Sequence, residues 1–305
     1  MSYNTIRDFK SMKNQQTFKV AIASGKGGTG KTTLSTNLAA YIAEREAVVL
    51  VDLDVEEPNS GLFFNGTLVH EEDNHNMTPN WDATKCTLCG LCEEVCNFNA
   101  IIQLGETIMV YPKLCHSCYA CSELCPVSAL PMQPTKIGVL RDYKWGKLHY
   151  VESRLNVGEE QAVSSIAKTQ RYVAEKYAHI SFAIFDSPPG TSCPVMEATK
   201  DADYVILVTE PTPFGLHDLK LAVETMRELE RDFGVVINRD GIGDEEVINY
   251  CNAESVEILA KIPNKRQIAE LYSRGNLIYP QFPEVESALN DILDFCLSIK
   301  EGANK

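Results

Sequence analysis

Short continuous runs of apolar residues recur along the chain and predict strands of a parallel β-sheet. The runs are FKVAIAS (18–24), AVVLVDL (47–53), FAIF (182–185), YVILVT (204–209) and GVVIN (234–238). Such runs, without polar alternation, are typical of strands buried on both faces. Segments with helical periodicity lie between them, as in TLSTNLAAYIAERE after the first run. This order indicates an α/β fold, with a mostly parallel, doubly wound sheet and helices on both faces.

The strand–helix alternation is interrupted between the second run and Tyr150 by a cysteine-rich stretch. Polar, turn-rich segments bound it, HEEDNHNMTPN (70–80) before and PMQPTK (131–136) after. We therefore predict an inserted α+β domain over residues 79–134, between two parts of the main domain at 1–78 and 135–305. We expect the insert to fold around metal groups rather than a large core. Residues 1–17 lack a clear pattern and are expected to be partly disordered.

Eight of the eleven cysteines occur in two copies of the spacing C-x2-C-x2-C-x3-C. The copies are Cys86, Cys89, Cys92 and Cys96, then Cys115, Cys118, Cys121 and Cys125, which Pro126 follows. This spacing resembles that of bacterial ferredoxins, in which the fourth cysteine of each run binds the cluster of the other run. The resemblance implies two [4Fe–4S] clusters, one on Cys86, Cys89, Cys92 and Cys125, the other on Cys96, Cys115, Cys118 and Cys121.

Two other interpretations of the cysteines are less favoured. Structural zinc also uses cysteines two residues apart, but seldom a third at the same short spacing. A disulfide framework is disfavoured because the N-terminus does not resemble a secretory signal. One position departs from the ferredoxin pattern, since Asn97 follows Cys96 where a proline is usual. That difference leaves the ligands intact and affects only the local turn.

A phosphate-binding loop follows the first apolar run. Its residues, which fit G-x-x-x-x-G-K-[ST], are Gly25, Lys26, Gly27, Gly28, Thr29, Gly30, Lys31, Thr32 and Thr33. Glycines let backbone N–H groups turn inward around phosphate oxygens, and the following helix adds the positive end of its dipole. We expect Lys31 to reach the β- and γ-phosphates of a nucleotide and Thr32 to bind Mg²⁺.

The additional lysine, Lys26, makes the match more specific. The string KGGTGKTT resembles the deviant Walker A box of the MinD, ParA, Mrp and nitrogenase iron-protein class of ATPases. The resemblance implies that ATP closes a face-to-face homodimer in which Lys26 contacts the nucleotide of the partner subunit. It also implies that Asp54 orients the attacking water near Mg²⁺ and that Asp186 holds the ion through water. Catalysis would thus rest on Lys26, Lys31 and Asp54.

The same resemblance assigns the adenine end of the site. Asn238 is expected to recognise the edge of the base, and the loop at Ile262–Pro263 to cover it. Carboxylates at strand ends are also common as helix caps, so Asp54 or Asp186 alone would be weak support. Their order behind a matched phosphate loop is what favours the assignment.

Composition narrows the choice of partners. The formal charge of −14 and the pI near 4.9 disfavour nucleic acid and anionic membranes. No apolar run approaches the roughly 18 residues of a transmembrane helix. The C-terminal segment has helical periodicity with an acidic face, unlike a basic membrane-targeting tail. Clusters and thiolates suit a reducing cytoplasm.

From about residue 18 to 290 the chain resembles MinD/Mrp-like ATPases that contain an inserted ferredoxin domain. The first hypothesis is ATP-gated electron transfer through the clusters to a partner protein. The alternative is a cluster or metallocofactor carrier of the Mrp type, which hands its cargo to a client. That type uses a C-x-x-C in the C-terminal half, whereas Cys193, Cys251 and Cys296 are isolated here. A spatial-positioning ATPase is less favoured, because basic surface and membrane tail are missing.

Cys193 lies seven residues after Asp186. The nitrogenase iron protein resembles this stretch and has a cluster-binding cysteine at the corresponding offset. A single further thiolate from the partner subunit would leave a shared cluster short of ligands. We therefore interpret Cys193 as a small residue that packs a loop, and leave open a thiol that binds metal only in the ATP-closed dimer.

Overall fold

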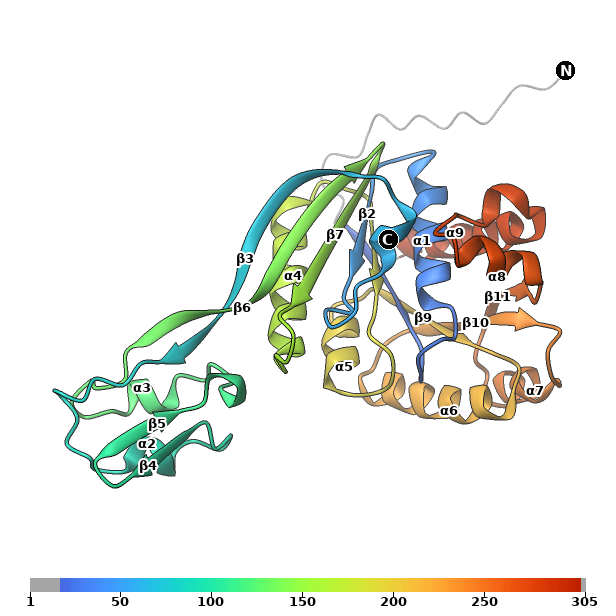
Figure 1. Ribbon diagram of the computed structural model, residues 1–305. Helices are drawn as coiled ribbons and strands as arrows, with labels where there is room; N and C mark the ends of the chain where they lie inside the picture. Colours follow the sequence, from blue (N-terminus) through green and yellow to red (C-terminus); the bar gives the residue numbers. More distant parts are fainter. Residues whose placement is uncertain (1–16, 303–305) are drawn as a thin grey trace, which may run out of the picture.

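The computed structural model describes residues 17–302. The disorder expected for the N-terminal segment falls on residues 1–16, which lie outside this described part. A nine-stranded sheet forms the centre of the molecule (Figure 1). Its strands, in chain order, are β1 (Phe18–Ala23), β2 (Val48–Asp52), β3 (Thr67–Pro79), β6 (Met132–Trp145), β7 (Leu148–Leu155), β8 (Phe182–Asp186), β9 (Tyr204–Thr209), β10 (Phe233–Asp240) and β11 (Ile258–Pro263).

Six of the strand pairs are parallel, as the apolar runs predicted. The strand order is β11-β10-β9-β1-β8-β2-β7-β6-β3, and every neighbouring pair from β11 to β7 runs parallel. All residues of β2, β8 and β9 are buried, which is why their sequences show no polar alternation. The α/β class and the mostly parallel sheet are confirmed.

Helices cover both faces of the sheet. The helices are α1 (Lys31–Ala43), α4 (Ala162–Lys176), α5 (Cys193–Thr199), α6 (Pro213–Glu228), α7 (Glu246–Ala253), α8 (Arg266–Tyr272) and α9 (Pro283–Gly302). α1, α8 and α9 share one apolar core, and α4 to α7 share the other. The side chains of β1 alternate between them, with Ile22 in the first core and Ala21 in the second.

The edge of the sheet departs from the prediction made for the polar segments. β3, β6 and β7 form an antiparallel ladder, and β3 pairs with β6 from Thr67↔Lys144 to Pro79↔Met132. Segments 70–80 and 131–136, expected as turns, are therefore strands. They escaped detection because their period-2 pattern is polar: Asn74, Asn76 and Thr78 alternate as buried residues. Each of the three forms side-chain hydrogen bonds, to Ser165, Gln161 and Thr135 respectively.

The ladder of β3 and β6 extends away from the main sheet as an arm (Figure 1). A small unit at its tip contains the two-stranded sheet of β4 (Ile101–Leu104) and β5 (Thr107–Val110), with the short helices α2 (Leu91–Glu94) and α3 (Ala120–Glu123). Ile101, Ile108, Cys121 and Leu130 form a separate small core there. Within residues 17–302, no helix is long and apolar enough to cross a membrane.

A buried carboxylate fastens the arm to α4. Asp142 of β6 is fully buried and accepts hydrogen bonds from Tyr172 Oη (2.8 Å), Lys176 Nζ (2.7 Å) and Tyr177 Oη. Burial alone would raise the pKa of Asp142, but these donors outweigh it and hold the pKa below its ordinary value. The folded arm therefore favours the ionised carboxylate.

Replacing this carboxylate should weaken the arm in a pH-dependent way. Because the folded pKa is depressed, ionised Asp142 stabilises the fold above the ordinary aspartate pKa, and the contribution is lost as pH falls below about 4. Asp142→Asn should lower the free energy of unfolding by about 2 kcal/mol at pH 7. Urea unfolding should show this difference shrinking toward pH 3. Asp73→Asn, which removes only an exposed ion pair with Lys136, is the matched control. A difference independent of pH would contradict this account.

Candidate functional site

A cavity of about 490 Å³ lies at the carboxyl ends of the parallel strands. This is the size range of small-molecule sites, and the position is where open α/β sheets bind ligands. The phosphate loop, the segment after β2 and the ends of β10 and β11 contribute its walls. Among the lining residues are Gly27, Gly28, Gly30, Lys31, Thr32, Thr33, Asp54, Glu57, Asn59, Asn238, Pro263 and Lys265.

The phosphate loop is held in shape by close contacts. Gly30 has φ +101°, and a Cβ there would lie 2.2 Å from Asn238 Nδ2, so both the conformation and the space require glycine. Asn238 donates from Nδ2 to the Thr29 carbonyl at 2.7 Å. The amide predicted to recognise adenine thus also braces the loop. Its assignment to the base stays a prediction.

Lys31 is buried at the first residue of α1 and donates from Nζ to Ser24 Oγ at 3.0 Å. Burial lowers its pKa, while Asp186, Asp54 and Asp52 act in the opposite direction. The charged Lys31 side chain therefore stays next to these carboxylates and to the open cavity, which it lines. This is the placement that a phosphate-binding lysine needs.

Two carboxylates are buried side by side next to this lysine. Asp52 and Asp186 end the neighbouring strands β2 and β8 and pair in register. Ser60 joins them, because its backbone N–H donates to Asp52 Oδ2 and its Oγ donates to Asp186 Oδ2, both at 2.9 Å. The N–H of Asn59 also donates to Asp52 Oδ2, at 2.9 Å. Asp186 Oδ1 is buried without a hydrogen-bond partner.

The surroundings of Asp52 and Asp186 disfavour their ionised forms. Burial raises the pKa of Asp52, and the neighbouring Asp186 raises it further. Burial also raises the pKa of Asp186, although hydrogen bonds from Thr32 and Ser60 act to lower it. Asp54 is half-buried and its pKa is raised by burial, which improves a carboxylate as a proton acceptor. A divalent cation beside the pair would offset the repulsion, so the residues present fit Mg²⁺.

Lys26 lies outside the lining of this cavity. Its Nζ is 3.7 Å from Asp218 Oδ2 of α6 in the same chain, and about a third of the side chain is exposed. The neighbouring Gly25 packs so closely on α6 that a Cβ would lie 2.2 Å from the Asp218 carbonyl oxygen. Three further predicted site residues, Gly25, Thr29 and Asp186, are also absent from the lining, and Thr29 and Asp186 are buried.

Sequence reasoning overlooked the part played by Asp52 and Ser60. Asp52 could have been suspected as a second acidic residue at a strand end, whereas Ser60 lies in a stretch without a recognisable pattern. We call residues 54–60, which lie between Asp54 and this serine, the switch segment. Lys265 and Tyr272, from the region after β11, were also missed as cavity residues.

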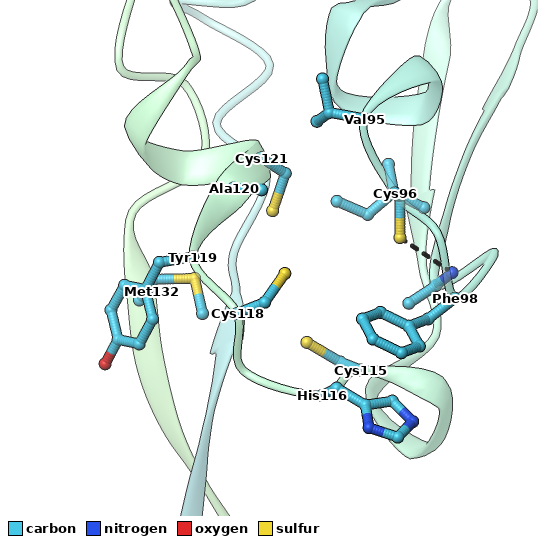
Figure 2. A pocket seen from close by; sticks show the side chains of 12 residues that line it. Val95, Cys96, Phe98, Cys115, His116, Cys118, Tyr119, Ala120, Cys121 and Met132 are labelled. Carbon is cyan, nitrogen blue, oxygen red and sulfur yellow. Dashed lines mark hydrogen bonds between the residues drawn. The ribbon is translucent and has the colours of Figure 1, made fainter.

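The eight repeated cysteines gather around two smaller cavities in the unit at the arm's tip. One is lined by Cys86, Cys89, Cys92 and Cys125, the other by Cys96, Cys115, Cys118 and Cys121. Each set takes three cysteines from one run and the fourth from the other run. Figure 2 shows the sulfur atoms of the second set directed into a common space. The predicted ligand sets are therefore brought together in space, while cluster binding itself stays a prediction.

The backbone repeats itself around the two cavities. Left-handed residues recur at equivalent places, as in Leu88 and Ser117, each two residues after the first cysteine of its run. The fourth cysteines are also alike, since Cys96 Sγ accepts from the Ala100 N–H at 3.3 Å and Cys125 Sγ from the Ala129 N–H at 3.2 Å. N–H groups directed at sulfur favour thiolates and tune iron–sulfur clusters.

The spacing of these thiols does not match a mononuclear ion. Four thiolates on one zinc ion bond at about 2.3 Å and so stand roughly 3.8 Å from one another. Within the described residues, no group of three or more His, Cys, Asp or Glu side chains is arranged to hold a single ion. The described cysteines are therefore not arranged as a site for a single zinc ion.

The three remaining cysteines have different environments. Cys251 and Cys296 are buried in the two apolar cores. Cys193 begins α5 and is exposed, so its interpretation as a residue that packs a loop is wrong. The short loop after the Asp186 strand leads directly into α5, which leaves this first turn on the surface.

Comparison with known proteins agrees with the nucleotide-binding geometry. Residues 20–278 match the CobQ/CobB/MinD/ParA nucleotide-binding domain. The chain belongs to this family. It is a P-loop ATPase, and it hydrolyses ATP.

Three proteins illustrate what this ATPase is similar to. An uncharacterized protein of Methanocaldococcus jannaschii is 32% identical over 84% of this chain and 89% of its own length. The iron-sulfur cluster carrier protein of Aquifex aeolicus is 25% identical over 88% of this chain and 64% of its own. The solved structure of Pyrococcus horikoshii MinD with Mg-ADP has a TM-score of 0.56 at 20% identity, covering 93% of this chain and 98% of that one. At this identity, the likeness shows that the two chains share a fold and no more.

Ser60 should prove important for turnover. Ser60→Ala removes the hydroxyl that donates to Asp186, the predicted magnesium residue, and leaves a buried acceptor unpaired. We expect ATP turnover to fall roughly tenfold and the Mg²⁺ concentration for half-maximal rate to rise, with ATP binding changed little. Phosphate release across a Mg²⁺ titration measures both quantities. Ser153→Ala, which truncates another buried, hydrogen-bonded serine in β7, is the control. Equal rates for both variants would exclude this role.

Proposed function

We propose that this ATPase is an iron–sulfur protein that couples ATP-dependent homodimer formation to electron transfer to a partner protein. One observation carries the proposal: two crossed sets of four cysteines lie in a unit whose arm is an extension of the ATPase sheet. A binding unit joined to the core by paired strands, rather than by a flexible linker, suits mechanical coupling to nucleotide.

The nucleotide chemistry is assigned to residues of the cavity. Lys31 and the backbone of residues 25–33 bind the phosphates, and Thr32 with Asp186 holds Mg²⁺. Asp54 orients the attacking water, which its raised pKa favours. Lys26 supplies a positive charge to the nucleotide of the partner subunit, after it exchanges Asp218 for the phosphates. Asn238 and the loop at Pro263 enclose the base.

The unit at the arm's tip is proposed to be a ferredoxin-like domain over residues 79–134. Cys86, Cys89, Cys92 and Cys125 would hold one [4Fe–4S] cluster, and the second set listed above would hold the other. Such clusters accept and release single electrons at low potential. The protein's own contribution is the N–H groups that reach Cys96 and Cys125 and the apolar residues that surround the thiols. A reducing, cytoplasmic setting suits both the clusters and the thiolates that would hold them.

A second candidate is an iron–sulfur cluster carrier. It is supported by relatives at 24–25% identity named iron-sulfur cluster carrier proteins, from Aquifex aeolicus and two Pyrococcus species. The isolated Cys193 and the buried Cys251 and Cys296 offer no C-x-x-C for a labile cluster. Electron transfer therefore remains the first choice. A charge of −14 disfavours a positioning ATPase that works on nucleic acid or anionic membrane.

The crossed ligand sets can be tested with single substitutions. Anaerobically reconstituted protein should hold about eight irons per chain as two clusters. Cys96→Ser should perturb the cluster of the second run, and Cys125→Ser that of the first run. EPR of the reduced proteins and iron analysis distinguish the two losses. Cys251→Ser, in the ATPase core, should keep all the iron. Stoichiometric zinc without an EPR signal would contradict the assignment.

The proposed function itself is tested by the effect of nucleotide on electron loss. Reduced protein should transfer electrons to a one-electron acceptor protein at a rate that ATP·Mg²⁺ changes several-fold and ADP·Mg²⁺ does not. Lys26→Ala should still bind ATP but lose the ATP-dependent dimer and the rate change, whereas Lys31→Ala should lose binding. Lys200→Ala, at an exposed ion pair, is the control. Stopped-flow absorbance and light scattering give the two readouts.

The carrier alternative predicts the opposite pattern. Iron would then pass to an apo-protein at an ATP-dependent rate, while the electron-transfer rate would not respond to nucleotide.

A further inference from the structure

Strand β7, which pairs with β6 of the arm, is hydrogen-bonded to the switch segment at its C-terminal end. The last two residues of β7 make both contacts: Arg154 Nη2 donates to the Pro58 carbonyl at 2.9 Å, and the Leu155 N–H donates to the Val55 carbonyl at 2.9 Å. These bonds lie on either side of Glu56 and Glu57. The short segment is thus attached to β7 at two points.

The same segment is bonded to the nucleotide site on its other side. Asp54, Glu57 and Asn59 line the nucleotide cavity. Asn59 and Ser60 donate backbone N–H groups to Asp52, and the Ser60 hydroxyl donates to Asp186. Any rearrangement of residues 54–60 around a γ-phosphate must therefore also act on Arg154 and Leu155. Loops of this kind in nucleotide hydrolases order or relax with the γ-phosphate.

Strand β6 continues the connection, with one register irregularity opposite Asn74 and His75 of β3. In the β6–β7 ladder Val139 pairs with Arg154 and Gly138 pairs with Leu155. The strands are in close contact here, because a Cβ on Gly138 would lie 2.2 Å from the Arg154 carbonyl oxygen. From Val139, β6 extends back to Met132, a distance of seven residue steps or roughly 23 Å of extended chain. Met132 lines the cavity of Cys96, Cys115, Cys118 and Cys121 (Figure 2).

The second cysteine run is also tied to the body of the ATPase. Ser117 Oγ donates to the Met77 carbonyl of β3 at 2.7 Å. Gln161, at the start of α4, donates from Nε2 to the Lys113 carbonyl at 3.0 Å and accepts from Asn76 Nδ2 at 3.1 Å. The loop that contains Cys115 and Cys118 therefore moves with the arm strands, not independently of them.

We propose that Arg154 is a positioning residue that couples the switch segment to this second cysteine cavity. Binding of ATP rather than ADP shifts residues 54–60, and the Pro58–Arg154 contact passes the shift through β7 and β6 to the loop at 112–118. The inference rests on the proposed function for its purpose, since it names the element through which nucleotide acts on the redox unit. Arg154 lines neither the nucleotide cavity nor the two cysteine cavities, and it is exposed, so its replacement leaves both cores intact.

Hydrogen–deuterium exchange on the full-length, iron-loaded protein tests this coupling. Wild-type protein is compared with ADP·Mg²⁺ and with a non-hydrolysable ATP analogue and Mg²⁺. Peptides covering 54–61 and 112–137 should both differ in exchange between the two nucleotides. In Arg154→Gln the difference at 54–61 should remain, while that at 112–137 should fall at least threefold. Arg154→Lys, which can still donate to the Pro58 carbonyl, should retain most of it.

Arg227→Gln is the matched control. Arg227 also donates to a backbone carbonyl, that of Glu254 at 3.2 Å, but in the distant α6–α7 region, so this variant should behave like wild type. The coupling is overturned if Arg154→Gln keeps a wild-type difference at 112–137, or if wild type shows none there while 54–61 responds. Iron content and electron-transfer rate are measured on the same samples. A failed electron-transfer assay with intact exchange coupling would refute the proposed function and leave the role of Arg154 standing.

Discussion

The buried pair of carboxylates at the ends of β2 and β8 governs the nucleotide site. Parallel pairing brings Asp52 and Asp186 into register, where neither can be fully solvated. Their repulsion is reduced by Ser60, by nearby N–H groups and by the buried Lys31. A cation held by such a pair and a phosphate held by such a lysine each supply charge that the other lacks. These contacts also order the switch segment, because its backbone N–H groups donate hydrogen bonds to the Asp52 carboxylate.

The arm is built on a different physical basis from the sheet that it extends. The central strands are stabilised by apolar residues on both faces, whereas β3 and β6 rely on ladder hydrogen bonds and buried amides such as Asn74 and Asn76. Asp142 adds a charged junction with α4. A polar ladder can project into solvent without exposing a hydrophobic surface, and its backbone bonds keep it stiff. The cysteine unit is consequently held at a defined distance from the ATPase core.

This arrangement separates the thiol cavities from the nucleotide cavity but links them through paired strands. The thiol cavities lie at the tip of the arm, away from the nucleotide cavity, yet β6, which begins at Met132, pairs with the β7 residues that are bonded to the switch segment. The family match over residues 20–278 spans the cysteine unit as well, and it accounts for the nucleotide site.

Local sequence determined the features that a few consecutive residues can specify. The strand–glycine loop–helix order around Lys31, the buried parallel strands and the repeated cysteine spacing were all readable, because each depends on neighbours within about ten positions. Tertiary structure alone decided the rest. Asn74, Asn76 and Thr78 form a strand only because α4 and β6 supply partners for their side chains. Ser60 gained its role from two strands that meet at one edge, and Cys193 became exposed because α5 begins directly at it. Contacts between distant segments fix such positions, so no pattern along the chain could report them.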